Sequence, residues 1–176
     1  MADDTKTGSS ETDQEHIFMK LDGIDGEVEG GDFDGQSAIR EFNYEVKLPL
    51  TKNRTRGGVT TDKSQHGHIM VKKVSDLASV KMWQHCCEGK AIAEVTFNWV
   101  RFSQGEMVVS REIVLTDVMV AQYGHVGNFP GHTDLPMEEV HMDFSTIKDT
   151  YTQQNSDGTT GGNVTFTWDN KLAVAG

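Results

Sequence analysis

Residues 75–89 read Ser-Asp-Leu-Ala-Ser-Val-Lys-Met-Trp-Gln-His-Cys-Cys-Glu-Gly and form the one convincing amphipathic helix of the chain. Ser75 or Asp76 can accept hydrogen bonds from the free amides of the first turn. Gly89 suits the left-handed residue that often ends a helix. The other ordered stretches read as β-strands, so the sequence predicts a mainly β protein with a single flanking helix.

The predicted helix has an apolar and a polar side. The apolar arc, with Leu77 at its edge, comprises Val80, Trp83, Cys87, Cys86 and Met82. The other side comprises Lys81, Gln84, His85 and Glu88. We expect the apolar arc to pack on the rest of the protein and the polar side to meet water or a partner.

Outside the helix, short apolar runs alternate with clusters of Gly, Asp and Asn, which is typical of strands joined by turns. The predicted strands are 16–21, 39–48, 68–74, 92–102, 106–122, 138–151 and 163–170. Together with one helix they indicate a barrel or sandwich. We expect a single domain over residues 16–176, and we interpret residues 1–15 as a disordered acidic tail because they hold almost no aliphatic side chain.

Two strands carry informative patterns. In strand 39–48, Phe42, Tyr44 and Val46 recur at every second position and should face the core. Strand 106–122 has apolar residues at both odd-numbered and even-numbered positions, and therefore on both of its faces. This predicts burial on both faces, in part against another subunit.

The composition excludes several classes of function. With 27 acidic and 16 basic residues, the formal net charge of −11 opposes binding to nucleic acid or to an anionic membrane. No segment reaches the roughly 20 apolar residues that a membrane helix requires, and the N-terminus does not resemble a Sec signal peptide. Cys86 and Cys87 are adjacent and diverge on a helix, so we expect both to be reduced.

A search for catalytic and ligand-binding patterns finds no nucleophile elbow and no phosphate-binding glycine loop. The remaining metal hypothesis is a small metalloenzyme that uses His66, His68 and His85, but the two nearby cysteines diverge and four convergent ligands are not apparent. We therefore predict no catalytic residue, no metal site and no cofactor, and we expect a role in binding or assembly.

The order of motifs resembles the Hcp family (hemolysin-coregulated proteins), the tube proteins of bacterial type VI secretion systems. The resemblance runs from residue 16 to about 171. The segments that carry it are Ile17-Phe18-Met19-Lys20-Leu21-Asp22-Gly23-Ile24-Asp25-Gly26-Glu27, Ile39 with the Phe42-x-Tyr44 strand, Val71 to Trp83, Val140-x-Met142-x-Phe144-x-x-Ile147, Asp157-Gly158 before a Gly-rich turn, and the closing Phe166-Thr167-Trp168-Asp169.

The resemblance implies a β-barrel of two packed antiparallel sheets with one flanking helix. It further implies homohexameric rings that stack into a hollow tube, partner with spike and sheath proteins, and carry effectors in the lumen. The protein would be cytoplasmic when assembled and secreted through the type VI system, and we expect no C-terminal toxin domain. The alternative from the residues alone is a monomeric β-barrel adaptor or binding module.

The resemblance also suggests roles for three sets of residues. The basic loop 51–67 would contact a neighbouring ring through Lys52, Arg54, Arg56 and Lys63, with Asp25, Glu27 or Asp32 of an adjacent subunit as acidic partners. The lumen and effector contact would involve Asn43, Glu45 and Lys47. The helix would contribute a subunit contact through Lys81, Gln84, His85 and Glu88.

Overall fold

The computed structural model describes residues 16–53, 58–61, 63–103, 106–128, 135–154 and 160–175, and the side chains of these residues except those of 51–53, 58–61, 103 and 175. Residues 1–15, with the predicted tail, and Arg54 and Arg56 lie outside the described residues. The elements are β1 (His16–Leu21), η2 (Gly31–Phe33), β2 (Ser37–Asn43), β3 (Val46–Lys47), β4 (Leu50–Asn53), β5 (Gly58–Thr61), β6 (Gln65–His66), β7 (Ile69–Val74), α1 (Leu77–Glu88), β8 (Ile92–Ser103), β9 (Glu106–Asn128), β10 (Pro136–Asp143), β11 (Thr146–Gln154), β12 (Thr160–Asp169) and β13 (Val174–Ala175).

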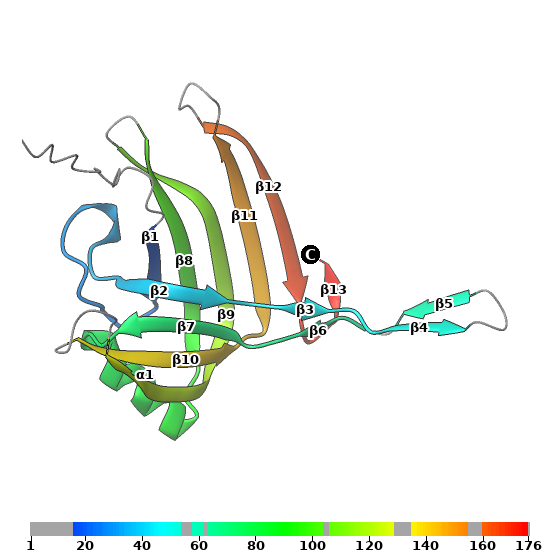
Figure 1. Cartoon of the computed structure of the whole chain (residues 1–176), viewed down its shortest axis with the longest axis horizontal. Helices are drawn as coiled ribbons and strands as arrows, with labels where there is room; N and C mark the ends of the chain where they lie inside the picture. The colour runs from blue at the N-terminus through cyan, green and yellow to red at the C-terminus, as the bar shows by residue number, and fades with distance from the viewer. Residues whose placement is uncertain are drawn as a thin grey trace, which may run out of the picture.

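The main sheet is antiparallel and has the strand order β10-β7-β2-β1-β8-β9-β11-β12-β13. Strand β10 also pairs with β9, so six strands close into an uneven barrel from which β11, β12 and β13 extend. Figure 1 shows the layer of β8, β9, β11 and β12 crossing the layer of β2, β7 and β10. This confirms the predicted mainly β fold of packed antiparallel sheets with one helix.

Strand β9 turns the corner between the two layers. It pairs with β11 up to Thr116 and with β10 from Met119 onward. Between these positions Asp117 has a φ of 50°, a left-handed conformation that is uncommon outside glycine. The inward face is Ile113 and Leu115 before this point, and Val118 and Val120 after it. Odd-numbered and even-numbered apolar residues thus line one core within the subunit. Burial of the other face against another subunit stays a prediction.

A second irregularity lies in β2, where the pairing with β7 shifts register between Ile39 and Glu41. The shift lets Ile39 and Phe42 both face the core, although they have opposite parity. Tyr44 also packs against the core, but Val46 is 50% exposed, contrary to prediction, because the chain has by then left the barrel. The predicted strand 138–151 is two strands, β10 and β11.

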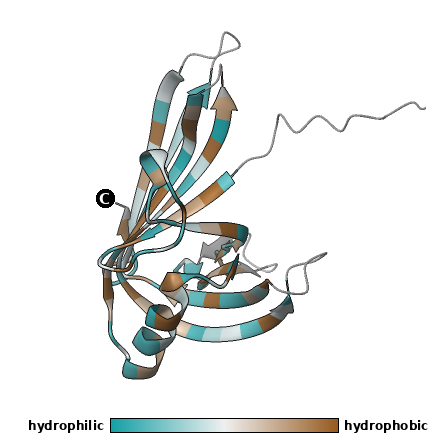
Figure 2. Ribbon diagram, turned by 90° about the vertical axis from the view of Figure 1, so that its left-hand side faces the viewer, coloured by the Kyte–Doolittle hydropathy of each residue, from teal (hydrophilic) through white to brown (hydrophobic). Residues whose placement is uncertain are grey.

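The core fills the space between the crossing layers and lies against the inner face of α1. Its fully buried members include Ile69, Val71, Val95, Phe97 and Leu115. Figure 2 shows apolar and polar residues alternating along the strands of both layers, as expected when one face of each layer is buried.

Helix α1 begins and ends as predicted. Asp76 is the N-cap and accepts a hydrogen bond from the Ala78 amide, and Gly89 ends the helix with a φ of 59°. The predicted buried arc was right for Met82 and for the half-buried Cys86, which packs against the core, but wrong for Val80, Trp83 and Cys87. The buried positions are Ala78, Ser79 and Met82, whereas Val80, Trp83 and Cys87 are exposed.

Candidate assembly surfaces and their support

A buried ion pair links the two strands beneath the helix. Lys73 on β7 and Glu138 on β10 are direct cross-strand partners, and both side chains are fully buried. The Lys73 Nζ lies 2.7 Å from the Glu138 Oε1. Because an uncompensated charge in a core is very costly, such a pair is stable only when further hydrogen bonds satisfy both groups.

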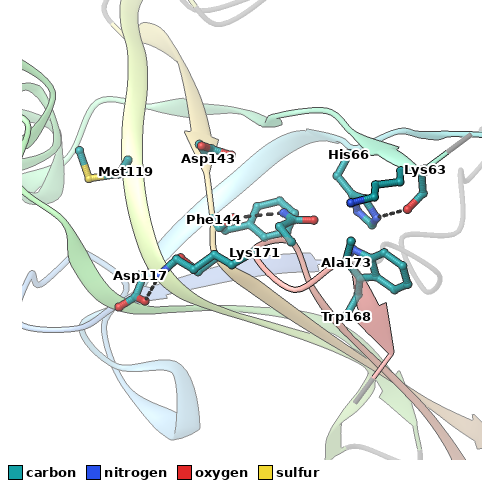
Figure 3. Close-up of a pocket in the computed structure, with 12 residues that line it drawn as sticks. Lys63, His66, Asp117, Met119, Asp143, Phe144, Trp168, Lys171 and Ala173 are labelled. Carbon is teal, nitrogen blue, oxygen red and sulfur yellow. Dashed lines mark hydrogen bonds and ion pairs between the residues drawn. The ribbon is translucent and has the colours of Figure 1, made fainter.

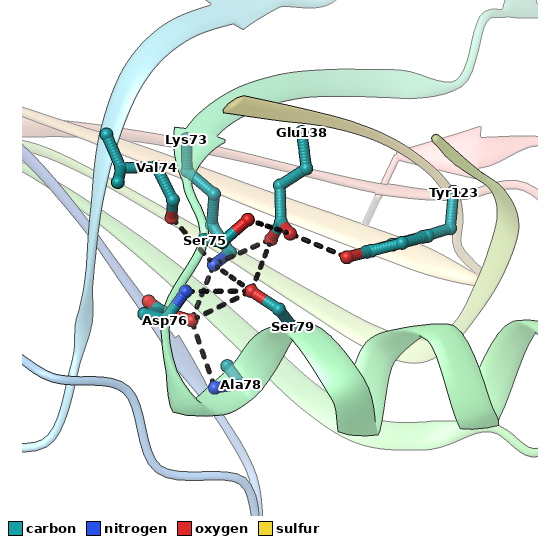
Figure 4. A network of polar contacts seen from close by, with 8 residues as sticks. All are labelled: Lys73, Val74, Ser75, Asp76, Ala78, Ser79, Tyr123 and Glu138. Atoms are coloured by element: carbon teal, nitrogen blue, oxygen red, sulfur yellow. Dashed lines mark hydrogen bonds and ion pairs between the residues drawn. The ribbon is translucent and has the colours of Figure 1, made fainter. Parts of the chain in front are cut away.

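Those further hydrogen bonds come from the start of the helix (Figure 4). Lys73 also donates to the Asp76 carboxylate and to the Ser79 hydroxyl. The Ser79 hydroxyl lies 2.9 Å from Glu138 Oε1, and the Asp76 amide donates to the Ser79 Oγ at 2.8 Å. The capping box of α1 is therefore continuous with the buried ion pair, which explains why the Ser79 side of the helix faces the sheet.

Tyr123 on β9 completes this network from the other side. Its hydroxyl donates to Glu138 Oε2 at 2.6 Å. Burial raises the pKa of Tyr123 above its ordinary value of 10.0, and the hydrogen bond to Glu138 adds to this effect. The Tyr123 ring also stacks on Trp83, with ring centroids 6.3 Å apart. One tyrosine thus contacts both the buried network and an exposed residue of the helix.

The outer face of α1 is apolar to an unusual degree for a water-facing surface. Leu77, Val80 and Trp83 are 65%, 69% and 56% exposed. Lys81, Gln84 and Glu88 are exposed beside them, and Gln84 donates to Glu88 at 2.7 Å. His85 is less exposed and its Nδ1 lies 3.0 Å from the Lys90 carbonyl oxygen. The role of the polar set in a subunit contact stays a prediction.

An arm protrudes from the barrel on the side away from α1 (Figure 1). The pairs β3–β6 and β4–β5 form this arm, and Lys52 lies on β4. The arm begins with Val46, Leu48 and Leu50, which are 50%, 51% and 56% exposed. Lys63 lies at its base, where it lines a cavity. The sequence therefore predicted a loop where the structure has a two-stranded arm.

The predicted lumen residues lie where β2 leads into this arm. Asn43 ends β2, and Glu45 and Lys47 follow as an exposed ion pair at 2.7 Å. The adjoining outer face of β7 and β10 is also polar, with Lys72 at 2.8 Å from Glu41 and 3.8 Å from Glu139. A lumen role for these residues stays a prediction.

An acidic recess of about 580 Å³ is lined largely by the loop between β1 and β2, which lies on the opposite side of the protein from the arm (Figure 1). Its walls are Asp25, Gly26, Glu27, Val28, Glu29, Asp34, Gly35 and Leu77. Backbone hydrogen bonds from Gly26 to Gly35 and from Val28 to Gln36 hold the two sides of the loop together. At Gly26 a Cβ atom would lie 2.4 Å from the Gln36 carbonyl oxygen, so only glycine fits there. The predicted partner Asp32 lies nearby in η2.

A second cavity, of about 510 Å³, lies at the base of the arm (Figure 3). Its lining includes His66, which hydrogen-bonds through Nδ1 to the Tyr44 hydroxyl and stacks on Trp168. Burial lowers the pKa of His66 and raises the pKa of Tyr44 to about 12. Asp117 in the same lining pairs with Lys171 at 3.3 Å. The contacts of His66 with Tyr44 and Trp168 anchor the base of the arm to the barrel.

The metal hypothesis finds no support in the described part of the chain. His66 and His85 engage Tyr44 and the Lys90 carbonyl, and the described residues contain no group of three or more His, Cys, Asp or Glu side chains placed to hold an ion. Among those residues there is also no helix long and apolar enough to cross a membrane.

Sequence reasoning missed the buried ion pair, although a signal was present. Ile69, Val71 and Lys73 alternate along one strand, so the two inward apolar residues place Lys73 inward as well. A lysine at a core position requires an acidic partner. Nothing in the local sequence identified Glu138, more than 60 residues away, as that partner.

Comparison with known proteins agrees with this architecture. The family model described as "Type VI secretion system effector, Hcp" matches residues 18–151. The chain belongs to the Hcp family. It is thus a structural tube subunit of a type VI secretion system. A search of curated proteins found no match.

Solved structures of type VI secretion system proteins, two of them named Hcp, share the fold at low sequence identity. "Structure of a type six secretion system protein" has a TM-score of 0.85 and 21% identity, covering 93% of this chain and 100% of that chain. Hcp1 from Salmonella typhimurium has a TM-score of 0.74 and 24% identity, covering 92% and 98%. The secreted Hcp3 from Pseudomonas aeruginosa has a TM-score of 0.64 and 20% identity, covering 89% and 98%.

Proposed function

We propose that this Hcp subunit closes into hexameric rings that stack into a hollow tube. The observation that carries the proposal is that the arm, which is basic in sequence, and the loop between β1 and β2, whose residues line the acidic recess, lie on opposite sides of one subunit (Figure 1). A contact between unlike surfaces is not self-complementary, so it generates closed rings or open filaments instead of twofold dimers. A tube of stacked rings needs both kinds of contact: one that closes each ring and one that stacks the rings into a filament.

The charges support a specific pairing. The arm segment carries Lys52, Arg54 and Arg56 in its sequence, and the recess of another copy presents Asp25 and Glu27. An exposed ion pair contributes only about 0–1 kcal/mol. Repetition of the contact around a ring and between rings would multiply that small contribution. The assembly should therefore weaken as the salt concentration rises.

Electron microscopy in negative stain and native mass spectrometry of the purified protein test the proposal. We expect rings with the mass of six subunits and, at low salt, stacks of rings. A protein that stays monomeric at all accessible concentrations would contradict the proposal and favour the adaptor alternative.

Charge reversal tests the arm. The Arg54→Glu/Arg56→Glu variant should lose stacking at low salt, while the same charge change at exposed Lys20 and Lys148 should preserve it. Continued stacking of the arm variant would exclude this role of the arm.

We further propose that the exposed face around Asn43, Glu45 and Lys47 lines the lumen and selects effectors. Support comes from the polar character of this face, which suits transient contact with folded cargo. The Glu45→Arg variant should form rings but change the set of effectors that co-purifies with it. An unchanged set would contradict the assignment, and Glu106→Arg at an exposed end of β9 serves as the control.

In this proposal the tube assembles in the cytoplasm with spike and sheath proteins and leaves the cell through the type VI system. Support comes from the family membership alone. Detection of the protein in culture medium from cells with a functional secretion system, but not from cells lacking the sheath, would test the route.

A further inference from the structure

We propose that the exposed apolar face of α1 is the docking surface for the arm of a second copy of this chain. This inference rests on the proposed self-assembly and names the surface that receives the arm. The helix stripe is Leu77, Val80, Trp83 and Cys87. The arm stripe is Val46, Leu48 and Leu50.

The two stripes match in chemistry. Three large apolar side chains of the helix and all three of the arm are at least half exposed in the single subunit. The covering of such side chains is favourable by about 25 cal/mol per Å² of apolar surface. Because the arm and α1 lie on opposite sides of the subunit (Figure 1), an arm cannot cover the helix of its own chain. We therefore assign the site to the arm of another copy, because that arm carries an exposed apolar stripe that this helix face can cover.

The change from apolar to charged residues follows the same order along the arm and along the surface that receives it. The arm is apolar at Val46–Leu50 and becomes basic from Lys52 onward. On the receiving side, Leu77 belongs both to the helix stripe and to the wall of the acidic recess. The apolar stripe of α1 therefore continues directly into the acidic surface. An arm laid along the helix would place its apolar start on the stripe and direct its basic end into the recess.

The lengths agree as well. From Val46 to Leu50 an extended chain spans about 13 Å at ~3.3 Å per residue. From Leu77 to Cys87 the helix rises about 15 Å at ~1.5 Å per residue. The order of charge sets the direction: with the basic end of the arm at the acidic recess, Leu50 lies near Leu77, and Val46 lies near Cys87 at the far end of the helix.

The buried network explains how the stripe is held in place. Ser79 and Asp76 fix the rotation of α1 through Lys73 and Glu138, so that the opposite, apolar side must point outward. The stacking of Trp83 on Tyr123 further restrains the stripe. A preorganised surface loses less conformational freedom when it binds.

Native Cys87 is exposed on the stripe and makes the register testable by disulfide cross-linking. In a Cys86→Ala background, the Val46→Cys variant should form a cross-linked dimer with Cys87 of another copy under mild oxidation. The yield should exceed that of Leu50→Cys by about tenfold, because a disulfide requires the two Cα atoms to lie within about 7 Å. Val164→Cys, at an exposed apolar position on β12, is the matched control and should remain uncross-linked.

Two additions sharpen the test. Replacement of Cys87 by Ala should abolish the Val46→Cys cross-link. Glu27→Lys/Glu29→Lys in the recess should reduce its yield several-fold at low salt, whereas Glu94→Lys/Glu106→Lys, which makes the same charge change at exposed sites elsewhere, should not.

The outcomes separate this contact from the proposed function. Rings that assemble without the Val46→Cys cross-link, or with preferential cross-linking of Leu50→Cys, would overturn the docking surface and leave ring formation intact. A wild-type protein that never assembles would overturn the proposed function, and the docking surface with it.

Discussion

Two lysine–glutamate pairs lie one residue apart on the same two strands and face opposite sides. Lys73 pairs with Glu138 on the inner face, and Lys72 pairs with Glu139 on the outer face. The inner side chains are fully buried and their charged atoms are 2.7 Å apart, whereas the outer side chains are about a quarter exposed and 3.8 Å apart. The same chemistry thus supports the fold on one face and adds little on the other, because water screens only the outer pair.

The largest expected effect comes from breaking the inner pair. Glu138→Ala leaves the Lys73 ammonium buried without its fully buried partner, and it also removes the acceptor for Tyr123. We expect a loss of about 3–5 kcal/mol in the free energy of unfolding, measured by urea denaturation.

The matched control is Glu139→Ala on the outer face, which should cost at most about 1 kcal/mol. The double variant Lys73→Met/Glu138→Leu should recover part of the loss, because no charge then remains buried at the pair. Equal losses for Glu138→Ala and Glu139→Ala would show that burial does not distinguish the two pairs.

A smaller effect is expected where the inner pair meets the helix. Asp76→Ala removes the N-cap of α1 and one carboxylate partner of Lys73, and should cost about 1–2 kcal/mol. Asp76→Asn keeps a side-chain oxygen that can cap the helix but lacks the negative charge. Comparing the stabilities of the two variants by urea denaturation separates the effect of capping from that of the ion pair. An Asp76→Asn variant as stable as the wild type would show that the charge of Asp76 contributes nothing.

The inner network should also respond to alkaline pH through Tyr123. The pKa of Tyr123 is raised in the folded protein, mainly by burial and then by Glu138, so the unfolded chain loses its phenol proton first, near its ordinary value of 10.0. The contribution of Tyr123 to the free energy of unfolding is therefore fully present below pH 10, and it is lost as the pH rises through the raised pKa of Tyr123. In urea denaturation at pH 8.5 and 11, Tyr123→Phe should lose less stability between the two than the wild type. An identical loss would contradict the role of Tyr123.

The smallest effect concerns salt. The destabilisation caused by Glu139→Gln should fall to nearly zero at about 1 M NaCl, where the screening length is about 3 Å. The destabilisation caused by Glu138→Gln should persist, because ions do not penetrate the core. Unfolding midpoints at low and high salt provide the measurement, and a Glu138→Gln effect that also vanishes would mean that water reaches the inner pair.

Much of the fold was predictable because it depends on local patterns. Strand β1 has the bounds predicted for it, and the limits of α1 follow from Asp76 and Gly89. The faces of the elements were less predictable. At Asp117 and between Ile39 and Glu41 the strands are irregular, so the side chains that face the core change from odd-numbered to even-numbered positions. These irregularities depend on how neighbouring strands pair.

The candidate surfaces likewise include features that the sequence predicted and features that it did not. The basic character of the arm and the acidic character of residues 22–35 follow from composition, and the sequence resemblance led to the Hcp family. The apolar outer stripe of α1 was misassigned to the core. Val80 and Trp83 have the residue types of a buried face, and only the attachment of Ser79 to the inner ion pair turns them outward.

The sequence by itself determined the helix with its caps, most of the strands and the separation of charge between arm and loop, because each depends on residues close together in the chain. The tertiary structure alone decided which side of α1 is buried and that Lys73 meets Glu138. Those outcomes depend on contacts between distant strands, where the cost of burying a charge outweighs the gain from burying an apolar arc.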